Sequence, residues 1–462
     1  MVSLPSVWYS CCFDVLCCGA YSVEFVLGVK MNLVLLLTLA VAGGQVATCG
    51  GGFNGVLPSL HRPANHSHIF YAVMFDAGST GTRIHIYTFI RKESEALPVL
   101  DNEMFHWVKP GLSAHADSPV TAAHSLRELL KVAKSTVPRP EWKRTPVVLR
   151  ATAGLRLLPA PKAQSLLDQV RRVFDESPFL VPDNSVSIMN GTSEGILAWI
   201  SVNFLSGHLH AGTKQTVGIL DLGGGSTQIT FLPHVKADVE KADEVGRLNI
   251  FNSSFVLYTR SYLGNGLMAA RLSTLGALGA RGPPQTVFKS PCLPKEFQDR
   301  WSFGGETYHV SGDPVGASGF DVCYQDVLKT VKGIIHQPQQ LRDTTHLFYA
   351  FSYYFDRALD AGLIDEVQGG TLEVSDFTRR AEEVCKKSSR ETRIRPFLCL
   401  DLTYISSLLK DGFGFKESTR LLLAKKVNNV EASWALGAML DHLNFLQTAP
   451  PHPHRWRPLS SW

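Results

Sequence analysis

Two stretches of this chain share one design, and this repetition constrains the fold more than any other feature. Residues 71–89, YAVMFDAGSTGTRIHIYTF, run as an apolar segment to Asp76, break into a Gly/Ser/Thr turn and resume with apolar residues at alternate positions. Residues 217–231, VGILDLGGGSTQITF, do the same around Asp221. Alternating apolar residues beside a polar turn indicate two strands joined by a loop. The sequence therefore predicts two similar hairpins.

The small residues in both loops suit the binding of an anion. Gly78 and Gly81 tolerate backbone dihedrals that a side chain forbids, so several N–H groups can point at one spot. The first loop lacks both the P-loop pattern and the dinucleotide pattern G-x-G-x-x-G. Alone, Asp76 is also an ordinary hydrogen-bonding turn residue. The second copy favours two phosphate clamps that face each other across a cleft.

Length and charge narrow the organisation and the partners. A chain of 462 residues suits two domains, because single cores stop growing at about 250–300 residues. The net charge of +4 is spread without a dense Lys/Arg run, which argues against nucleic-acid binding as the main role.

The N-terminal segment indicates export. An apolar core at residues 33–42, LVLLLTLAVA, is followed by small residues, which is the layout of a signal peptide cleaved near Ala47. This core is shorter than the roughly twenty residues of a membrane span. We expect a leader over residues 1–47, with Met31 as a second candidate initiator, and no stable membrane span after cleavage. The mature chain is therefore predicted to be soluble in the secretory pathway.

Four cysteines in the second half fit that oxidising compartment. Cys292, Cys323, Cys385 and Cys399 fall as two near-neighbour pairs. Four cysteines allow three pairings, and short loops favour Cys292–Cys323 with Cys385–Cys399.

Strands and helices alternate after the first hairpin, which predicts an α/β fold. Helical spacing at residues 122–137 and 164–174 flanks a buried strand at 145–150. That strand ends in ATAGLRLLP, which places Thr152 at the strand end where α/β sheets bind ligands. Taken alone, the motif is better explained as a strand-to-helix turn with Thr152 as its cap.

A second strand, at residues 185–189, leads through NGTSE into a buried helix at 196–204. We expect Thr192 or Ser193 to be the N-cap, which places Glu194 in the first turn. There it is either a carboxylate that complements the helix dipole or a general base that faces the cleft. Its position alone leaves both open.

The second half supplies a charged helical segment ahead of Tyr258 and an aromatic run at residues 347–355. Most of these rings belong in a core, but an exposed Tyr353 or Tyr354 could stack on a flat base. Further helices are expected at residues 400–409 and 430–440, a flexible lead-in at residues 48–68, and a C-terminal tail at residues 448–462.

Five blocks in order resemble the motifs of the apyrase or ecto-nucleoside triphosphate diphosphohydrolase family. The similarity covers about residues 70–445. In detail, the blocks most resemble those of the soluble nucleoside diphosphatases of the secretory pathway. The blocks are DAGSTGTR at 76–83, ATAGLRLLP at 151–159, residues 187–204, DLGGGSTQITF at 221–231, and residues 427–440.

The resemblance implies an actin-like fold, in which two ribonuclease-H-like α/β domains enclose a nucleotide and a divalent cation. By analogy, domain I comprises residues 69–189 and 430–447. Domain II comprises residues 190–429 and carries the cysteines.

The resemblance also implies roles for individual residues. Glu194 would deprotonate the attacking water, which Ser226 and Gln228 would orient. Asp76 and Asp221 would hold Mg²⁺ or Ca²⁺ largely through water. A base would stack on Tyr353 or Tyr354, a choice that stays open. Phosphate contacts are implied for Gly78, Ser79, Thr80, Gly81, Arg83, Thr152, Gly223, Gly224, Gly225 and Ser226.

The implied reaction is metal-dependent hydrolysis of nucleoside diphosphates such as UDP and GDP, by direct attack of water, in a monomeric enzyme. One alternative is a kinase, a polyphosphatase or a nucleoside triphosphate hydrolase with the same two loops. Another is a catalytically silent nucleotide-binding module, against which the presence of Glu194 argues.

Sequons occur at Asn65, Asn190 and Asn252. We predict glycans at Asn65 and Asn252. Asn190 lies four residues before Glu194, where a glycan would obstruct the cleft, so we expect it to be unmodified.

Overall fold

The computed structural model describes residues 67–92, 98–209, 215–233, 245–250, 253–279, 286–332, 335, 337, 341, 347–386 and 394–448. All of them belong to the second of two compact units, residues 1–57 and 58–462. The predicted leader, most of the lead-in and the sequons at Asn65 and Asn252 lie outside the described residues.

The first sheet has five strands in the order β3-β2-β1-β4-β5. β1 pairs antiparallel with β2 and parallel with β4, so the predicted first hairpin is confirmed. Helices α2 and α4 pack against one face, where Phe75 of β1 meets Phe174 of α4. The elements are β1 Ser67–Ala77, β2 Thr82–Lys92, β3 Val99–Val108, β4 Val147–Ala151, β5 Val186–Ile188, α2 Pro119–Thr136, α3 Ala153–Arg156 and α4 Ala160–Asp175.

The second sheet has seven strands in the order β14-β15-β13-β6-β7-β9-β8. Its central strands β9-β7-β6-β13-β15 repeat the first sheet in order and in strand direction. This duplicated topology confirms the predicted actin-like class and the second hairpin. The strands are β6 Gly218–Leu222, β7 Ser226–Phe231, β8 Val245–Ile250, β9 Ser253–Leu263, β13 Phe348–Ser352, β14 Gly370–Glu373 and β15 Arg420–Leu423.

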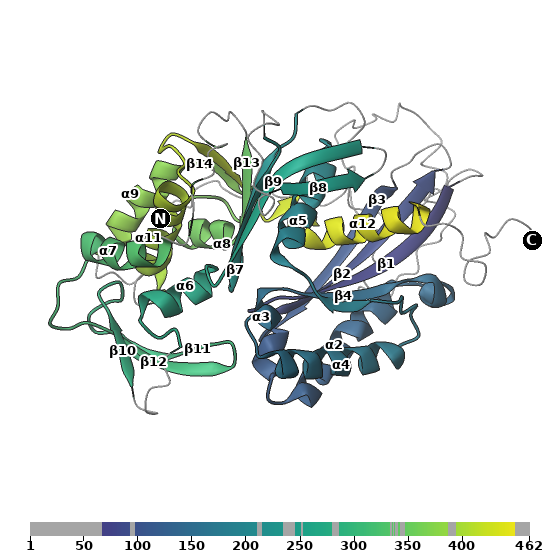
Figure 1. Cartoon of the computed structure of the whole chain (residues 1–462), viewed down its shortest axis with the longest axis horizontal. Coiled ribbons are helices and arrows are strands. Elements are labelled where there is room, and N and C mark those ends of the chain that lie inside the picture. The colour runs from purple at the N-terminus through teal and green to yellow at the C-terminus, as the bar shows by residue number, and fades with distance from the viewer. Residues whose placement is uncertain are drawn as a thin grey trace, which may run out of the picture. The chain divides into compact units, whose positions relative to one another are not determined.

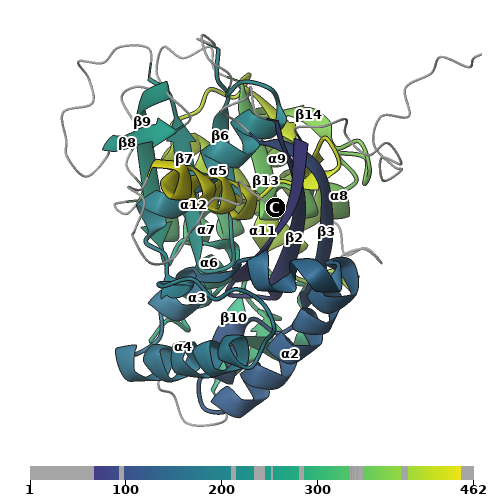
Figure 2. The ribbon, with the colours of Figure 1, turned by 90° about the vertical axis from the view of Figure 1, so that its right-hand side faces the viewer.

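Two helices, α5 Gly191–Leu205 and α12 Trp434–Thr448, lie side by side between the two sheets (Figures 1 and 2). A Cβ on Gly437 of α12 would lie 1.9 Å from the backbone oxygen of Leu197, so only glycine allows this approach. The helices share one hydrophobic cluster with Met74 of β1 and Ile219 of β6. The last helix thus returns to the first sheet. The exact division into residues 69–189 with 430–447 and residues 190–429 remains a prediction.

Two expected elements differ from the structure. The described part of the segment expected to be helical before Tyr258 forms strands β8 and β9, because buried residues such as Leu248 and Ile250 alternate with exposed ones. The last helix begins at Trp434 and not at Val430. Residues Val430–Glu431 instead form the short strand β17, which pairs with β16 at Lys426–Val427.

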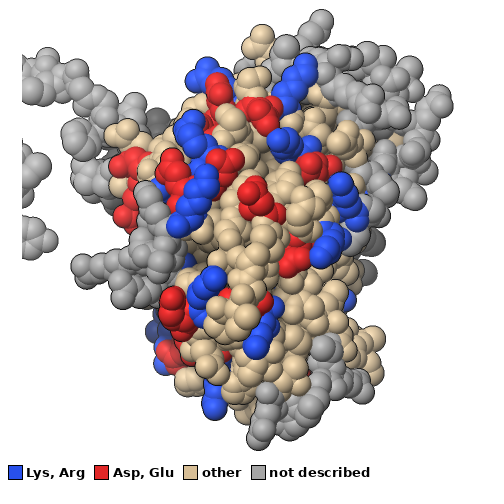
Figure 3. Space-filling model, turned by 90° about the vertical axis from the view of Figure 1, so that its left-hand side faces the viewer, with Lys and Arg blue, Asp and Glu red and all other residues tan. Residues whose placement is uncertain are grey.

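Helices and a small sheet surround the outer part of the second sheet. Charges of both signs are interspersed on the face that includes α7 and α9, as is typical of a solvated surface (Figure 3). Some of them are ion pairs one helical turn apart, such as Asp326 with Lys329. The elements are α6 Leu267–Thr274, β10 Val287–Ser290, β11 Gln298–Phe303, β12 Glu306–Gly312, α7 Phe320–Val331, α8 Tyr353–Asp360, α9 Val374–Lys386 and α11 Leu398–Ser407. Among the residues described, none of the helices is long and apolar enough for a membrane span.

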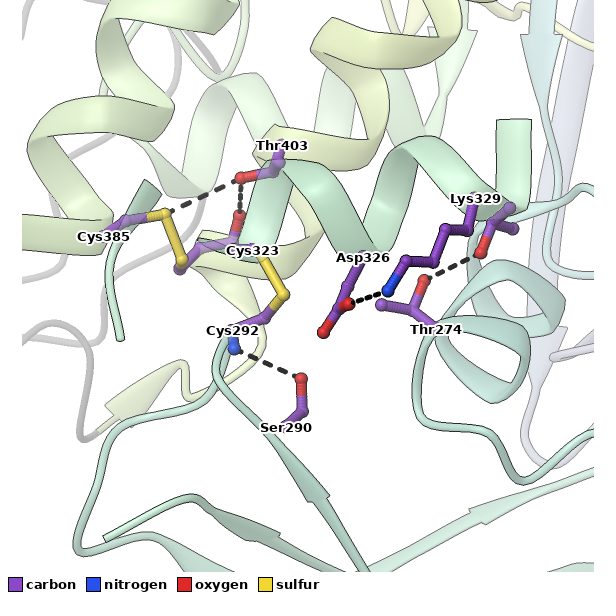
Figure 4. Close-up of a disulfide and its surroundings, with 10 residues drawn as sticks. Thr274, Ser290, Cys292, Cys323, Asp326, Lys329, Cys385 and Thr403 are labelled. Carbon is purple, nitrogen blue, oxygen red and sulfur yellow. Dashed lines mark hydrogen bonds and ion pairs between the residues drawn. A yellow bond between two sulfur atoms is a disulfide. The ribbon is translucent and has the colours of Figure 1, made fainter. Parts of the chain in front are cut away.

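Both predicted disulfides are present (Figure 4). Cys292, just after β10, is bonded to Cys323 of α7, with Cα atoms 4.7 Å apart. Cys385 of α9 is bonded to Cys399 of α11, with Cα atoms 4.9 Å apart. The bonds fix helices of the second sheet to their neighbours.

Replacement of Cys385 and Cys399 together by Ala is expected to lower the thermal unfolding midpoint by several degrees. Closing a loop of this length is worth about 3 kcal/mol through the unfolded chain, as estimated by the chain-entropy model. Differential scanning fluorimetry without reductant measures the shift. Turnover at 25 °C should stay within about twofold of the wild type, because this bond joins α9 to α11 and neither cysteine lines the cleft described below. An unchanged midpoint would mean that the bond adds no stability.

Candidate active site

A cleft of about 450 Å³ lies where the two sheets approach each other. Such a volume is typical of small-molecule sites. It brings together the predicted phosphate, metal and catalytic residues except Gln228, which lies buried behind it, and Tyr354. These lining residues are Asp76, Gly78, Ser79, Thr80, Gly81, Arg83, Thr152, Glu194, Asp221, Gly223, Gly224, Gly225, Ser226 and Tyr353.

The two glycine-rich loops meet at the cleft. A Cβ on Gly224, in the β6–β7 loop, would lie 2.5 Å from Ser79 Oγ and 2.7 Å from Thr80 Cγ2 of the β1–β2 loop. A Cβ on Gly154 would lie 2.8 Å from the Cα of Ser79. Glycine at these positions is therefore what lets the loops and α3 come so close. The two loops therefore face each other, as the sequence predicts.

Thr152 precedes α3 at the same place. Its side chain makes no capping hydrogen bond, and it is buried against the cleft. Thr152 therefore occupies the N-cap position of α3, as the cap explanation expects, but its hydroxyl makes no capping bond and is available to the cleft.

Asp76 and Asp221 occupy equivalent places, near the ends of β1 and β6, and both are buried. Asp76 Oδ2 accepts a hydrogen bond of 2.9 Å from Arg83 Nη1. The Oδ1 atoms of both aspartates have no hydrogen-bond partner among the described residues. Burial raises the pKa of Asp221 to about 6; Ser352 lowers it by hydrogen bonding, and the charge of Asp76 adds to the rise.

These two carboxylates fit a hydrated divalent cation. Buried oxygens without donors are unfavourable unless a cation or its water neutralises them. Within the described part of the chain, no three His, Cys, Asp or Glu side chains gather at one point. A hard cation that keeps much of its water, as Mg²⁺ does, suits such a sparse set of protein ligands.

Glu194 lies in the first turn of α5. The N-cap is Asn190, whose Oδ1 accepts a hydrogen bond of 2.7 Å from Ser193 N, so the expectation of Thr192 or Ser193 as the cap was wrong. The N-cap lies earlier than expected because α5 already begins at Gly191. In this first turn Glu194 is buried at the cleft, and its carboxylate meets the side chain of Gln228.

A compact network surrounds the Glu194 carboxylate. Oε2 accepts a hydrogen bond from Arg156 Nη2 and one of 3.2 Å from Gln228 Nε2. Ser226 Oγ accepts from the same two donors, at 3.2 Å from Arg156 and 2.9 Å from Gln228. Because Ser226 Oγ accepts twice, its own O–H can donate into the cleft.

The electrostatics favour a base that titrates near neutral pH. Burial raises the pKa of Glu194 to about 8. Arg156 acts in the opposite direction, whereas the charges of Asp221 and Asp76 add to the rise. A carboxyl with a raised pKa is a stronger base once it is ionised, which is the property that general-base catalysis uses.

Arg156 is a candidate functional residue that the sequence analysis missed. It lies within the ATAGLRLLP block, but the pattern assigned it no task. The structure places it against both Glu194 and Ser226. The approach is tight, since a Cβ on Gly191 would lie 2.7 Å from Arg156 Nη1. The available signal was a lone arginine in an otherwise small and apolar motif.

Replacement of Arg156 by Gln should shift the pH dependence of activity. Loss of the guanidinium removes the charge that lowers the pKa of Glu194, so the carboxylate form becomes rarer at neutral pH. The acid limb of kcat/KM should move to higher pH, with at least about a tenfold loss at pH 7. Arg156→Lys keeps the charge and should shift the limb less. An acid limb that is identical in Arg156→Gln and the wild type would contradict this role.

Of the two candidate tyrosines, only Tyr353 reaches the cleft. Tyr353 is partly buried, and its ring lies 5.6 Å from Arg357 Cζ. Tyr354 is fully buried in the core of the second sheet with Phe355. The expectation that kept Tyr354 as a base contact therefore fails for lack of access.

The comparisons with known proteins point to one family. Residues 62–455 match the GDA1/CD39 (nucleoside phosphatase) family. Ectonucleoside triphosphate diphosphohydrolase 5 of Gallus gallus is 55% identical over 397 residues, which are 85% of this chain and 92% of that protein. The nucleoside diphosphate phosphatase ENTPD5 of Homo sapiens is 53% identical over the same shares. Ectonucleoside triphosphate diphosphohydrolase 6 of Homo sapiens is 48% identical over 392 residues, 84% of this chain and 80% of that protein.

A solved structure supports the fold. The crystal structure of nucleoside triphosphate hydrolases from Neospora caninum superimposes with a TM-score of 0.59 at 15% sequence identity. The match covers 83% of this chain and 94% of that one.

Proposed function

The chain belongs to the GDA1/CD39 family of nucleoside phosphatases, and we propose that it hydrolyses nucleoside diphosphates to nucleoside monophosphates and phosphate. The family places it among hydrolases of phosphoric anhydrides. We propose UDP and GDP as the substrates. The observation that carries the proposal is the position of Glu194 in a buried network beside two glycine-rich loops.

In the proposed reaction the terminal phosphate lies between the two loops. Backbone N–H groups and the hydroxyls of Ser79 and Thr80 would contact its oxygens, and Arg83 would add a positive charge. The hydroxyl of Thr152, which precedes α3, would donate a further hydrogen bond to the phosphate. Positioning and charge compensation are the main contributions that a loose phosphoryl-transfer transition state requires.

The attacking water would be held by Glu194 and Ser226. As its oxygen bonds to the terminal phosphorus, the bond from that phosphorus to the bridging oxygen breaks and the nucleoside monophosphate leaves. Glu194 takes the proton of the water. Gln228 is a positioning residue, because its amide holds both the carboxylate and the serine hydroxyl.

Asp76 and Asp221 would hold Mg²⁺ or Ca²⁺, largely through water. When bound, the cation supplies positive charge to the phosphate oxygens. The two unpartnered Oδ1 atoms support this assignment.

We also propose that the enzyme acts as a monomer in the lumen of the endoplasmic reticulum or after secretion. The signal-peptide pattern at residues 33–42 and the two disulfides support an oxidising compartment. The side chain of Asn190 is exposed and caps α5, and its predicted lack of a glycan remains a prediction.

The test is phosphate release by the purified protein from a panel of nucleoside di- and triphosphates, with Mg²⁺, Ca²⁺ or a chelator. We expect release from UDP and GDP that exceeds release from the triphosphates and stops with chelator. Equal or faster release from triphosphates would favour a triphosphate hydrolase. Nucleotide binding without any metal-dependent release would favour the silent binding module.

A further inference from the structure

Trp107 is the most unusual side chain at the cleft that the proposed reaction does not use. It lies on β3 and lines the cleft, yet its residue surface remains 50% exposed. Trp is highly buried on average, because its large ring is mostly apolar. A half-exposed indole in the wall of a ligand cleft therefore calls for a ligand explanation.

The strand register fixes where Trp107 lies relative to the phosphate loops. Asp76 pairs with Arg83, and Arg83 pairs with Trp107, so the three residues form one row across β1, β2 and β3. Directly paired residues point to the same face of a sheet. The Cα atom of Trp107 is thus two strand spacings, about 10 Å, from that of Asp76, with Arg83 between them.

That separation suits the far end of a nucleotide. If the terminal phosphate lies at the loop beside Asp76, the second phosphate and the ribose extend away from it. Arg83 can contact the phosphates, and the base then lies further along the row. The second sheet supplies another ring to the same cleft, because Tyr353, the first residue of α8, lines it together with Arg83.

Each of the two rings also carries a cation. Lys109 Nζ lies 5.2 Å from the centroid of the Trp107 ring, and Arg357 lies at 5.6 Å from that of Tyr353. A cation over an aromatic face is a favourable contact that restrains both side chains. Lys109, two residues along the chain, therefore restrains the Trp107 indole, and half of the residue's surface stays exposed for stacking.

We propose that Trp107 is a specificity-determining residue that stacks on the nucleobase from the first sheet, while Tyr353 contacts it from the second. The inference rests on the proposed function, because it assumes phosphates at the two loops. A base stacks on any aromatic face, and the larger ring system of a purine overlaps more of an indole. Trp107 therefore favours guanine over uracil.

The test compares Trp107→Ala with Trp107→Phe and with His106→Ala, a matched control. His106 is the next residue of β3 and pairs with Ile84, so it points to the opposite face of the sheet. Activity is measured with GDP, with UDP and with inorganic tripolyphosphate, which has no base. Nucleotide affinity is measured by calorimetry in a Glu194→Gln background, which separates binding from turnover.

Trp107→Ala should raise KM for GDP by roughly ten- to a hundredfold, raise it less for UDP, and leave kcat and cleavage of tripolyphosphate nearly unchanged. Trp107→Phe should restore much of the loss, and His106→Ala should behave as the wild type. If nucleotide kinetics are unchanged, or if tripolyphosphate cleavage falls equally, the proposal is overturned. If the wild type releases no phosphate but Trp107→Ala still weakens nucleotide binding in calorimetry, the proposed function fails and the stacking role stands.

Discussion

Replacement of Glu194 by Gln is expected to lower kcat by roughly 10²–10⁴, the usual contribution of a general base. The amide keeps the shape of the side chain and can still accept from Arg156 and Gln228, but it cannot take a proton from water. Nucleotide affinity should change little, because the loops that would hold the phosphates are untouched. Single-turnover phosphate release together with calorimetry separates the two effects.

Glu431→Gln is the matched control. Glu431 also lines the cleft, and burial likewise raises its pKa. Within the described part of the chain, however, the side chains of Ser226 and Gln228 bond to each other, to Arg156, to Glu194 and to Ser261, and not to Glu431. It should lose less than about tenfold. Equal losses in the two variants would mean that any cleft carboxylate matters through its charge. Full turnover in Glu194→Gln would remove the base assignment.

The same substitution should affect stability in the opposite direction to activity. A raised pKa means that the folded protein holds a proton on Glu194 that the unfolded chain loses above about pH 4.5. The carboxyl therefore destabilises the fold progressively as the pH rises from about 4.5 to about 8. The thermal midpoint of Glu194→Gln, relative to the wild type, should be higher at pH 8.5 than at pH 5. A constant difference would show that Glu194 is ionised throughout.

Replacement of Asp221 by Asn is expected to reduce divalent-cation affinity or activity by about 10–100-fold, the range observed for groups that act on a metal through its outer shell. The carboxamide removes one of two negative charges and leaves the buried position filled. Titration of phosphate release with Mg²⁺ and with Ca²⁺ measures the apparent activation constant. A higher metal concentration should recover part of the activity.

Asp356→Asn serves as the control for Asp221→Asn, because Asp356 lines the cleft but belongs to α8 and not to either loop. Its activation constant should match that of the wild type. Asp76→Asn is a less clean test, since it also weakens the bond to Arg83. A wild-type metal response in Asp221→Asn would show that this carboxylate does not serve a cation.

The hairpins and their loops were predictable because local chemistry specifies them. An aspartate at a strand end, glycines in the turn and alternating apolar residues act within a few positions of each other. The sequence around Asp76 and around Asp221 therefore suffices to predict each hairpin, and the repeat indicates that the two hairpins act together. The disulfide pairs were predictable for the same reason, since each closes a short loop.

The network around Glu194 could not be predicted, because it depends on packing between distant segments. Arg156, Glu194 and Ser226 come from α3, α5 and β7, and nothing in their local sequence fixes the angle at which these elements meet. Backbone irregularity set a second limit. Ser352 has a φ of 58°, which turns the chain between β13 and α8 and decides that Tyr353, and not Tyr354, reaches the cleft. Alternation or helical spacing does not reveal such a turn.

The central claim is that water, activated by Glu194, attacks the terminal phosphorus directly. The most direct test is the stereochemical course of hydrolysis of a nucleoside β-thiodiphosphate that is isotopically chiral at the β-phosphorus, in ¹⁸O-labelled water. One in-line displacement predicts thiophosphate that carries one solvent oxygen with inverted configuration. Retained configuration would demonstrate two displacements through a covalent phosphoenzyme, and would contradict the role of Glu194 as the base that activates water for direct attack.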